Sequence, residues 1–141
     1  MASTDWQEIT GDLVARLLPE RAPDANKGTF GKCLVVAGSI NYTGAAYLAT
    51  SAAMRVGAGL TTLATAGDLL ELFQIKLTES TFIPLPTDMG VIAARANTVV
   101  EKAIAERGYN VLLLGPGIGQ EKETQNFVYR LLGIRREPTI A

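Results

Sequence analysis

The sequence predicts an α/β fold with a mostly parallel sheet and helices on both of its faces. Short apolar runs of strand length alternate along the chain with longer segments of helical composition or spacing. The strand-like runs are apolar at nearly every position, as in parallel strands buried on both faces. Glycines stand where several of these runs end. Strand–helix alternation of this kind indicates right-handed crossovers within one sheet, and 141 residues suit a single domain, 1–141.

Five segments are expected to be helical. Thr10 precedes apolar residues at helical spacing and is therefore an expected N-cap. Alanine, leucine and methionine dominate the second segment, and Gly108 follows the fourth in the C-cap region. The expected helices are a short one from Thr10 to near Pro19, then 44–57, 68–77, 92–107, and a last one defined by Phe127, Val128, Leu131 and Leu132 that ends at Gly133.

Four segments are expected to be strands, and a polar loop, 20–31, precedes the first of them. Their β-rich composition and their bounding Gly, Pro or Asn residues predict this. The expected strands are 32–37, 60–66, 81–85 and 111–114. The residues Glu137-Pro138-Thr139-Ile140-Ala141 look like the first residues of a further strand.

Composition excludes several classes of protein. With 48% hydrophobic and 19% charged residues the chain is not intrinsically disordered, and no apolar run approaches the roughly 20 residues of a membrane span. A net charge of -1 makes nucleic acid an unexpected partner. The N-terminus lacks the pattern of a secretory signal, so we expect a cytoplasmic protein. Without histidine there is no Ser-His-Asp triad, and the single cysteine, Cys33, excludes disulfides and is expected to be a small buried hydrophobe.

Two glycine-rich loops are the candidate ligand site. They follow strands 32–37 and 111–114, and ligands of parallel α/β sheets bind beyond the carboxyl ends of the strands. Small residues and helix N-termini there favour a phosphate or another anion. Either loop alone is equally well explained as a tight turn, whereas the pair favours a ligand site. The candidate binding residues are Ser39, Asn41, Tyr42, Gly44 and Ala45 in the first loop and Gly115, Gly117 and Gly119 in the second.

Lys27, in the polar loop, is a further candidate because its ammonium could reach a phosphate, although a solvated surface lysine is the simpler reading. Neither glycine-rich loop is a Walker A motif, since no Gly-Lys-Ser/Thr follows.

Five ordered segments, read together, are more specific than either loop. They are Leu17-Leu18-Pro19-Glu20-Arg21; Lys27-Gly28-Thr29-Phe30-Gly31-Lys32 running on into Leu34-Val35-Val36-Ala37-Gly38-Ser39; Tyr42-Thr43-Gly44-Ala45-Ala46; Arg55-Val56-Gly57-Ala58-Gly59-Leu60; and Leu114-Gly115-Pro116-Gly117-Ile118-Gly119-Gln120. In this order they resemble the ADP- or ATP-dependent NAD(P)H-hydrate dehydratase family of the ribokinase-like superfamily, from Thr10 onward. The resemblance implies a three-layer α/β/α ribokinase-like fold.

The resemblance also implies an activity. Members of the family use ADP or ATP with Mg²⁺ to dehydrate hydrated NADH or NADPH, a hydro-lyase reaction of nicotinamide nucleotide repair. By similarity, Ala45 and Gly117 contact the hydrated dinucleotide, and Asn41, Tyr42 and Gly44 line the same pocket. A homo-oligomer is also expected, and the strand at 111–114 is expected to leave an apolar sheet edge exposed.

The chain departs from the family in length and in motifs. It resembles only the N-terminal half of the family domain, and the family's Gly-Thr-Gly-Asp motif with its catalytic aspartate is absent from these 141 residues. By the resemblance, that aspartate would lie beyond Ala141. We therefore expect no catalytic residue and no metal ligand in this chain, and no turnover by the chain alone. Two alternatives stay open: a ribokinase-like small-molecule kinase, and a non-catalytic nucleotide-binding module.

Overall fold

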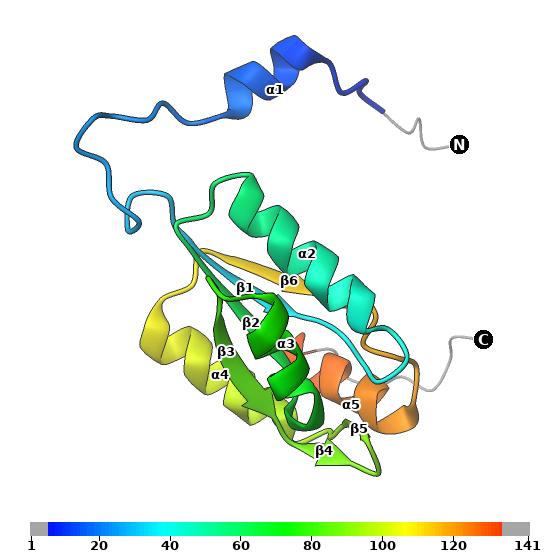
Figure 1. The fold of residues 1–141 in the computed structure, drawn as a ribbon. Helices are drawn as coiled ribbons and strands as arrows, with labels where there is room; N and C mark the ends of the chain where they lie inside the picture. Colours follow the sequence, from blue (N-terminus) through cyan, green and yellow to red (C-terminus); the bar gives the residue numbers. More distant parts are fainter. Residues whose placement is uncertain (1–5, 134–141) are drawn as a thin grey trace.

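The computed structural model of the chain describes residues 6–133 and is built around a four-stranded parallel sheet (Figure 1). The strand order is β3-β2-β1-β6. All four expected strands are confirmed to within one residue, and the residues of the further strand expected from 137 to Ala141 lie outside the described part. The strands are β1 (Lys32–Val36), β2 (Leu60–Ala66), β3 (Thr81–Leu85) and β6 (Val111–Leu114).

Helices cover both faces of the sheet, as the sequence predicts (Figure 1). Successive residues of a strand point to opposite faces, so β1 contributes to two apolar clusters. Val35 packs in the cluster that contains Phe73, whereas Leu34 packs in the one that contains Phe127. The helices on the first face are α2 (Thr43–Arg55) and α3 (Leu70–Lys76), the latter preceded by the 3₁₀ turn η1 (Gly67–Leu69), and those on the second are α4 (Ala96–Arg107) and α5 (Lys122–Leu131).

Burial of β1 on both faces explains its uninterrupted apolar run. Leu34, Val35 and Val36 are completely buried, and Cys33 is 9% exposed. Removal from water disfavours the thiolate, so burial raises the pKa of the Cys33 thiol. The expectation that this cysteine is a small buried hydrophobe is confirmed.

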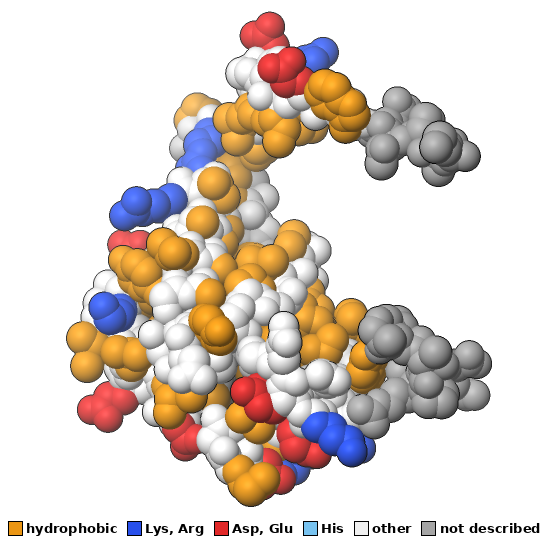
Figure 2. Space-filling model, turned by 90° about the vertical axis from the view of Figure 1, so that its right-hand side faces the viewer, with side chains coloured by type: hydrophobic (Ala, Val, Ile, Leu, Met, Phe, Trp, Pro, Cys, Tyr) orange, Lys and Arg blue, Asp and Glu red, His pale blue; other side chains and the backbone are white. Residues whose placement is uncertain are grey.

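The N-terminal helix α1 (Gly11–Leu17) stands apart from the sheet (Figure 1). Thr10 Oγ1 accepts a hydrogen bond from the Leu13 N–H at 3.2 Å, which confirms the expected N-cap. No residue of α1 is buried. Figure 2 shows apolar side chains along the side of the N-terminal segment, residues 6–18, that faces the sheet. The large apolar residues exposed in this segment are Trp6, Ile9, Val14, Leu17 and Leu18.

One helix begins later than the sequence predicts. Apolar spacing predicts its start at residue 92, but α4 begins at Ala96. The residues before it form β5 (Val91–Ile92), which pairs antiparallel with β4 (Thr87–Asp88). Met89 and Gly90 join these two strands with φ of 47° and 82°, the positive values that a two-residue hairpin turn requires. Ile92 is buried as a strand residue, and spacing alone does not separate that role from a helical one.

β6 is an edge strand with apolar side chains on the surface. Val111 is 57% exposed, and Leu112 and Leu113 are each 37% exposed. The expected exposed apolar edge is therefore present within residues 6–133. Across the same residues, no helix has the length and apolar character needed to span a membrane.

Candidate ligand site

The two glycine-rich loops meet at the carboxyl edge of the sheet because their strands end at the same level. Val36 is in register with Leu114, so the chain leaves β1 and β6 side by side. Two backbone hydrogen bonds then join the loops: the Gly115 N–H donates to the Val36 carbonyl at 3.0 Å, and the Gly38 N–H donates to the Pro116 carbonyl at 2.9 Å. The expected meeting of both loops at one sheet edge is confirmed.

Gly117 brings the second loop into contact with the start of α2. A Cβ at this position would lie 2.7 Å from the Ala45 Cβ and 2.8 Å from the Tyr42 Cβ, closer than real side chains pack. Its φ of +66° is also one that L-residues rarely adopt. This glycine therefore does more than turn the chain, because it allows the two loops to touch.

A hollow of about 580 Å³ lies where the loops meet. That volume is within the usual range of roughly 300–1,000 Å³ for small-molecule sites. Six of the nine candidate residues line it, and three further residues that the sequence analysis did not single out complete the lining. The expected lining residues are Asn41, Tyr42, Ala45, Gly115, Gly117 and Gly119, and the additional ones are Ile118, Gln120 and Glu121.

Three candidates lie elsewhere. Ser39 is 8% exposed and its carbonyl accepts the Tyr42 N–H at 3.0 Å, so it supports the loop from within. Gly44 lies in the first turn of α2 and is not among the residues that line the hollow. Lys27 lies at the opposite edge of the sheet, where its carbonyl packs against Gly59 just before β2. The structure does not bring the Lys27 side chain to the hollow.

The hollow offers backbone donors and one charged side chain. Gly117, Gly119 and Gln120 line the hollow, and no acceptor among the described residues pairs with their N–H groups. Glu121 is the N-cap residue of α5, and its carboxylate folds back against Gly119. No Lys or Arg of the described residues lines this space. The side-chain charge is therefore negative, against the expectation of a simple anion site.

Magnesium is implied by the family resemblance, but the described residues do not fit it. Between Trp6 and Gly133, no three His, Cys, Asp or Glu side chains come together as a metal-holding group. Glu121 alone is a poor site, because Mg²⁺ requires six oxygen ligands in near-octahedral order. We assign no metal ligand to this part of the chain.

The catalytic aspartate of the family is expected beyond Ala141, and Ala141 itself lies outside the described residues. That expectation therefore stays a prediction. Within residues 6–133, the hollow contains one carboxylate, that of Glu121, and no described side chain is assigned a catalytic role.

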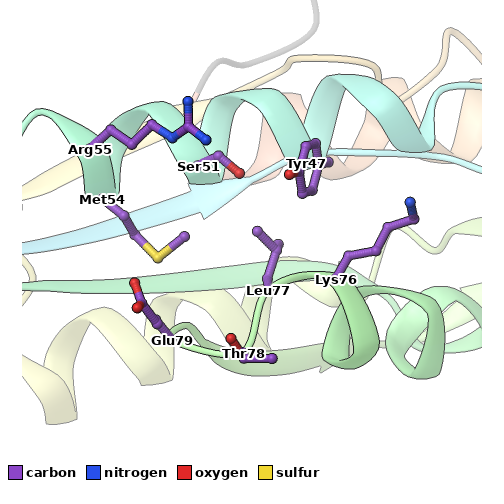
Figure 3. A pocket seen from close by; sticks show the side chains of 8 residues that line it. All are labelled: Tyr47, Ser51, Met54, Arg55, Lys76, Leu77, Thr78 and Glu79. Atoms are coloured by element: carbon purple, nitrogen blue, oxygen red, sulfur yellow. The ribbon is translucent and has the colours of Figure 1, made fainter.

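A second hollow of about 280 Å³ separates α2 from the segment that joins α3 to β3 (Figure 3). Arg55 and Lys76 border it, but each lies in the last turn of its helix, where a cation stabilises the negative end of the helix dipole. The Lys76 Nζ lies 5.7 Å from the centre of the Tyr47 ring. Figure 3 shows the Arg55 side chain directed away from Leu77 and Glu79. These cations have structural roles, so the hollow between the loops is the better candidate.

Comparisons with known proteins point to one family. The profile of a family described as NAD(P)H-hydrate dehydratase matches residues 33–140. A bifunctional NAD(P)H-hydrate repair enzyme from Moorella thermoacetica is 35% identical over 124 residues, which are 87% of this chain and 23% of that protein. The ADP-dependent (S)-NAD(P)H-hydrate dehydratase from Bacillus subtilis is 34% identical over 123 residues, which are 87% of this chain and 41% of that protein.

Solved structures of similar fold include a member of the same family. A crystal structure of the ADP/ATP-dependent NAD(P)H-hydrate dehydratase from Bacillus subtilis, co-crystallised with ATP/Mg²⁺, matches with a TM-score of 0.68 and 31% identity over 88% of this chain. A ribokinase-like superfamily protein from Enterococcus faecalis matches with a TM-score of 0.72 at 22% identity, a likeness of fold. The chain spans 41% of each of these two structures. The ribokinase-like fold expected from the sequence is confirmed over that share.

Proposed function

Because this chain belongs to the NAD(P)H-hydrate dehydratase family, we propose that its hollow binds the hydrated nicotinamide nucleotide on which that family acts. The observation that carries the proposal is the contact of Gly117 with Tyr42 and Ala45, which builds the hollow from both glycine-rich loops. The whole enzyme would be a hydro-lyase that restores NADH or NADPH from the hydrate.

The described residues would bind and orient this substrate. The Gly117, Gly119 and Gln120 N–H groups would donate hydrogen bonds to its oxygen atoms, as backbone donors do in many small-molecule sites. Asn41 would add an amide, and the exposed Tyr42 ring would supply an apolar wall for the hydrated ring. Placement of this kind is a large part of catalysis, because it fixes the substrate relative to the reacting group.

The chemistry itself would depend on the nucleotide. ADP or ATP, when bound, supplies the phosphoryl group that turns the ring hydroxyl into a phosphate leaving group. None of the described residues is assigned to that transfer, and the chain spans about two fifths of the ADP-dependent relatives. We therefore propose that residues 1–141 contribute the substrate-side part of a family domain.

The proposal is tested by titrating the S form of hydrated NADH into the 141-residue chain in a calorimeter. We expect saturable binding, and we expect Gly117→Ala to weaken it by at least about tenfold, because the new methyl group must push the loops apart.

Gly108→Ala is the matched control. Its φ of +62° imposes the same backbone strain, but no atom of the described residues lies within 4 Å of its Cβ position, and Gly108 ends α4 and does not line the hollow. An equal loss of affinity in both variants would show that strain and not the site is responsible. The absence of binding at millimolar ligand would overturn the proposal.

We also propose that the chain self-associates through its exposed β6 edge and that it acts in the cytoplasm. The exposed Val111, Leu112 and Leu113 side chains support the first point.

A further inference from the structure

We propose that Glu121 determines which end of the hydrated dinucleotide occupies the hollow, by accepting hydrogen bonds from the ribose hydroxyls of the uncharged nicotinamide riboside end. The pyrophosphate and the adenosine then lie outside it. This inference rests on the function proposed above and assigns a specificity role to one residue of that site.

Charge is the first argument. Among the described lining residues, Glu121 and the Tyr42 phenol are the ionisable side chains. No described Lys or Arg lines the hollow opposite Glu121. A pyrophosphate placed there would meet a like charge, a repulsion of surface strength because Glu121 is exposed to solvent. The hydrated nicotinamide ring and its ribose carry no charge. They offer hydroxyl groups and a carboxamide as donors.

The availability of the carboxylate is the second argument. Glu121 occupies the N-cap position of α5, but its side chain makes no capping hydrogen bond. It is not in an ion pair with a described residue, and Gln125 bonds to the Glu121 carbonyl and the Gln120 carbonyl, not to the carboxylate. Both carboxylate oxygens can therefore accept hydrogen bonds from a ligand.

Geometry is the third argument. The carboxylate folds back against Gly119, a residue whose N–H makes no hydrogen bond with another described residue. The hollow thus presents donors and a strong acceptor side by side. A sugar diol next to a carboxamide satisfies both kinds of group, whereas a phosphate satisfies only the donors. An acidic residue at a nucleotide site commonly binds a ribose in this way.

The test is a competition against the S form of hydrated NADH on the 141-residue chain. The two competitors are the hydrate of reduced nicotinamide riboside, which has no phosphate, and ADP-ribose, which has no nicotinamide. We expect the riboside to displace hydrated NADH at concentrations at least about tenfold below those of ADP-ribose. Glu121→Gln should weaken the riboside by about five- to tenfold, in line with loss of a charge-assisted hydrogen bond. Glu121→Lys should make ADP-ribose the better competitor.

Glu71→Gln removes an exposed carboxylate on α3 and is the control for the change in net charge. Stronger competition by ADP-ribose on the unchanged chain would overturn the inference, as would equal effects of Glu121→Gln and Glu71→Gln. In either case the binding of hydrated NADH persists and the proposed function stands. Loss of that binding altogether would instead count against the function.

Discussion

The Glu123 carboxylate accepts a hydrogen bond from the Ala94 N–H at 3.1 Å and so ties the first turn of α5 to the segment between β5 and α4. Ala94 is buried, so its N–H has little access to water. This bond fixes α5 relative to α4. Because α5 begins with Lys122, directly after Glu121, the bond also holds the far wall of the ligand hollow in place.

Glu123→Ala should therefore destabilise the chain by about 1–3 kcal/mol, the usual penalty for a buried donor that loses its acceptor. Glu123→Gln keeps an acceptor oxygen and should lose less than half of that. Urea denaturation followed by circular dichroism measures both variants. Equal stability losses would show that the hydrogen bond does not contribute.

Gly38→Ala is expected to destabilise the chain by about 2–4 kcal/mol. The new Cβ would lie 2.8 Å from the Ala46 Cβ at a φ of +86°, so overpacking adds to backbone strain. Gly133 has a φ of +65°, and no atom of the described residues lies within 4 Å of its Cβ position, so Gly133→Ala should destabilise the chain by only about 1–2 kcal/mol. Thermal melts of the two variants separate crowding from strain, and indistinguishable melts would argue against the close contact at Gly38.

The Cys33 thiol should make stability fall at alkaline pH. Burial raises its pKa in the folded chain, so the unfolded chain loses this proton first as pH rises. The contribution of the thiol is fully present below the ordinary thiol pKa of 9.0 and declines above it. Urea midpoints measured from pH 7 to 10 should show this decline, and Cys33→Ala should have a shallower one. Identical slopes would contradict the assignment.

The β6 edge should drive self-association, because Val111 to Leu114 carry no charge or proline that would block pairing with another strand. Light scattering over a hundredfold range of concentration should give a mass that rises with concentration. Leu112→Lys should shift that mass toward the monomer, whereas Leu72→Lys, an equally exposed leucine on α3, should not. A monomer at every concentration for the unchanged chain would rule the interface out.

The chain alone should not convert hydrated NADH to NADH in the presence of ADP and Mg²⁺. The described residues offer binding groups but no three-ligand metal site, and the chain contains no histidine. Absorbance at the NADH band follows the reaction, with full-length Bacillus subtilis dehydratase as the positive control. Turnover above the spontaneous rate would show that 141 residues suffice.

The sequence predicted the sheet well because β1 and β2 are buried on both faces, and such burial leaves an unbroken apolar run that period and composition reveal. It predicted the two loops for a similar reason, since strand ends and glycines are local features. The meeting of the loops followed from the general rule that parallel strands share one edge.

Other parts depended on contacts that no local pattern encodes. Ile92 fits a helical stripe and a buried strand equally, and only its pairing with Thr87 decides. Lys27 is close to Cys33 in the sequence, but it precedes β1 and lies at the amino end of the parallel strands. Its side chain therefore does not reach the carboxyl end of the sheet, where the hollow lies. Glu121 was missed because its importance depends on a side chain that folds back over Gly119.

The position of β1 between β2 and β6 also orders the folding of the chain. β2 follows β1 after one helix, whereas β6 pairs with β1 across about half of the sequence, and loop closure over the longer separation is slower. We expect β1, α2 and β2 to associate first and β6 to dock last. The second loop of the hollow arrives only with β6. A ligand in that hollow would therefore bind only the chain in which β6 has docked. It would slow the separation of β6 from the sheet.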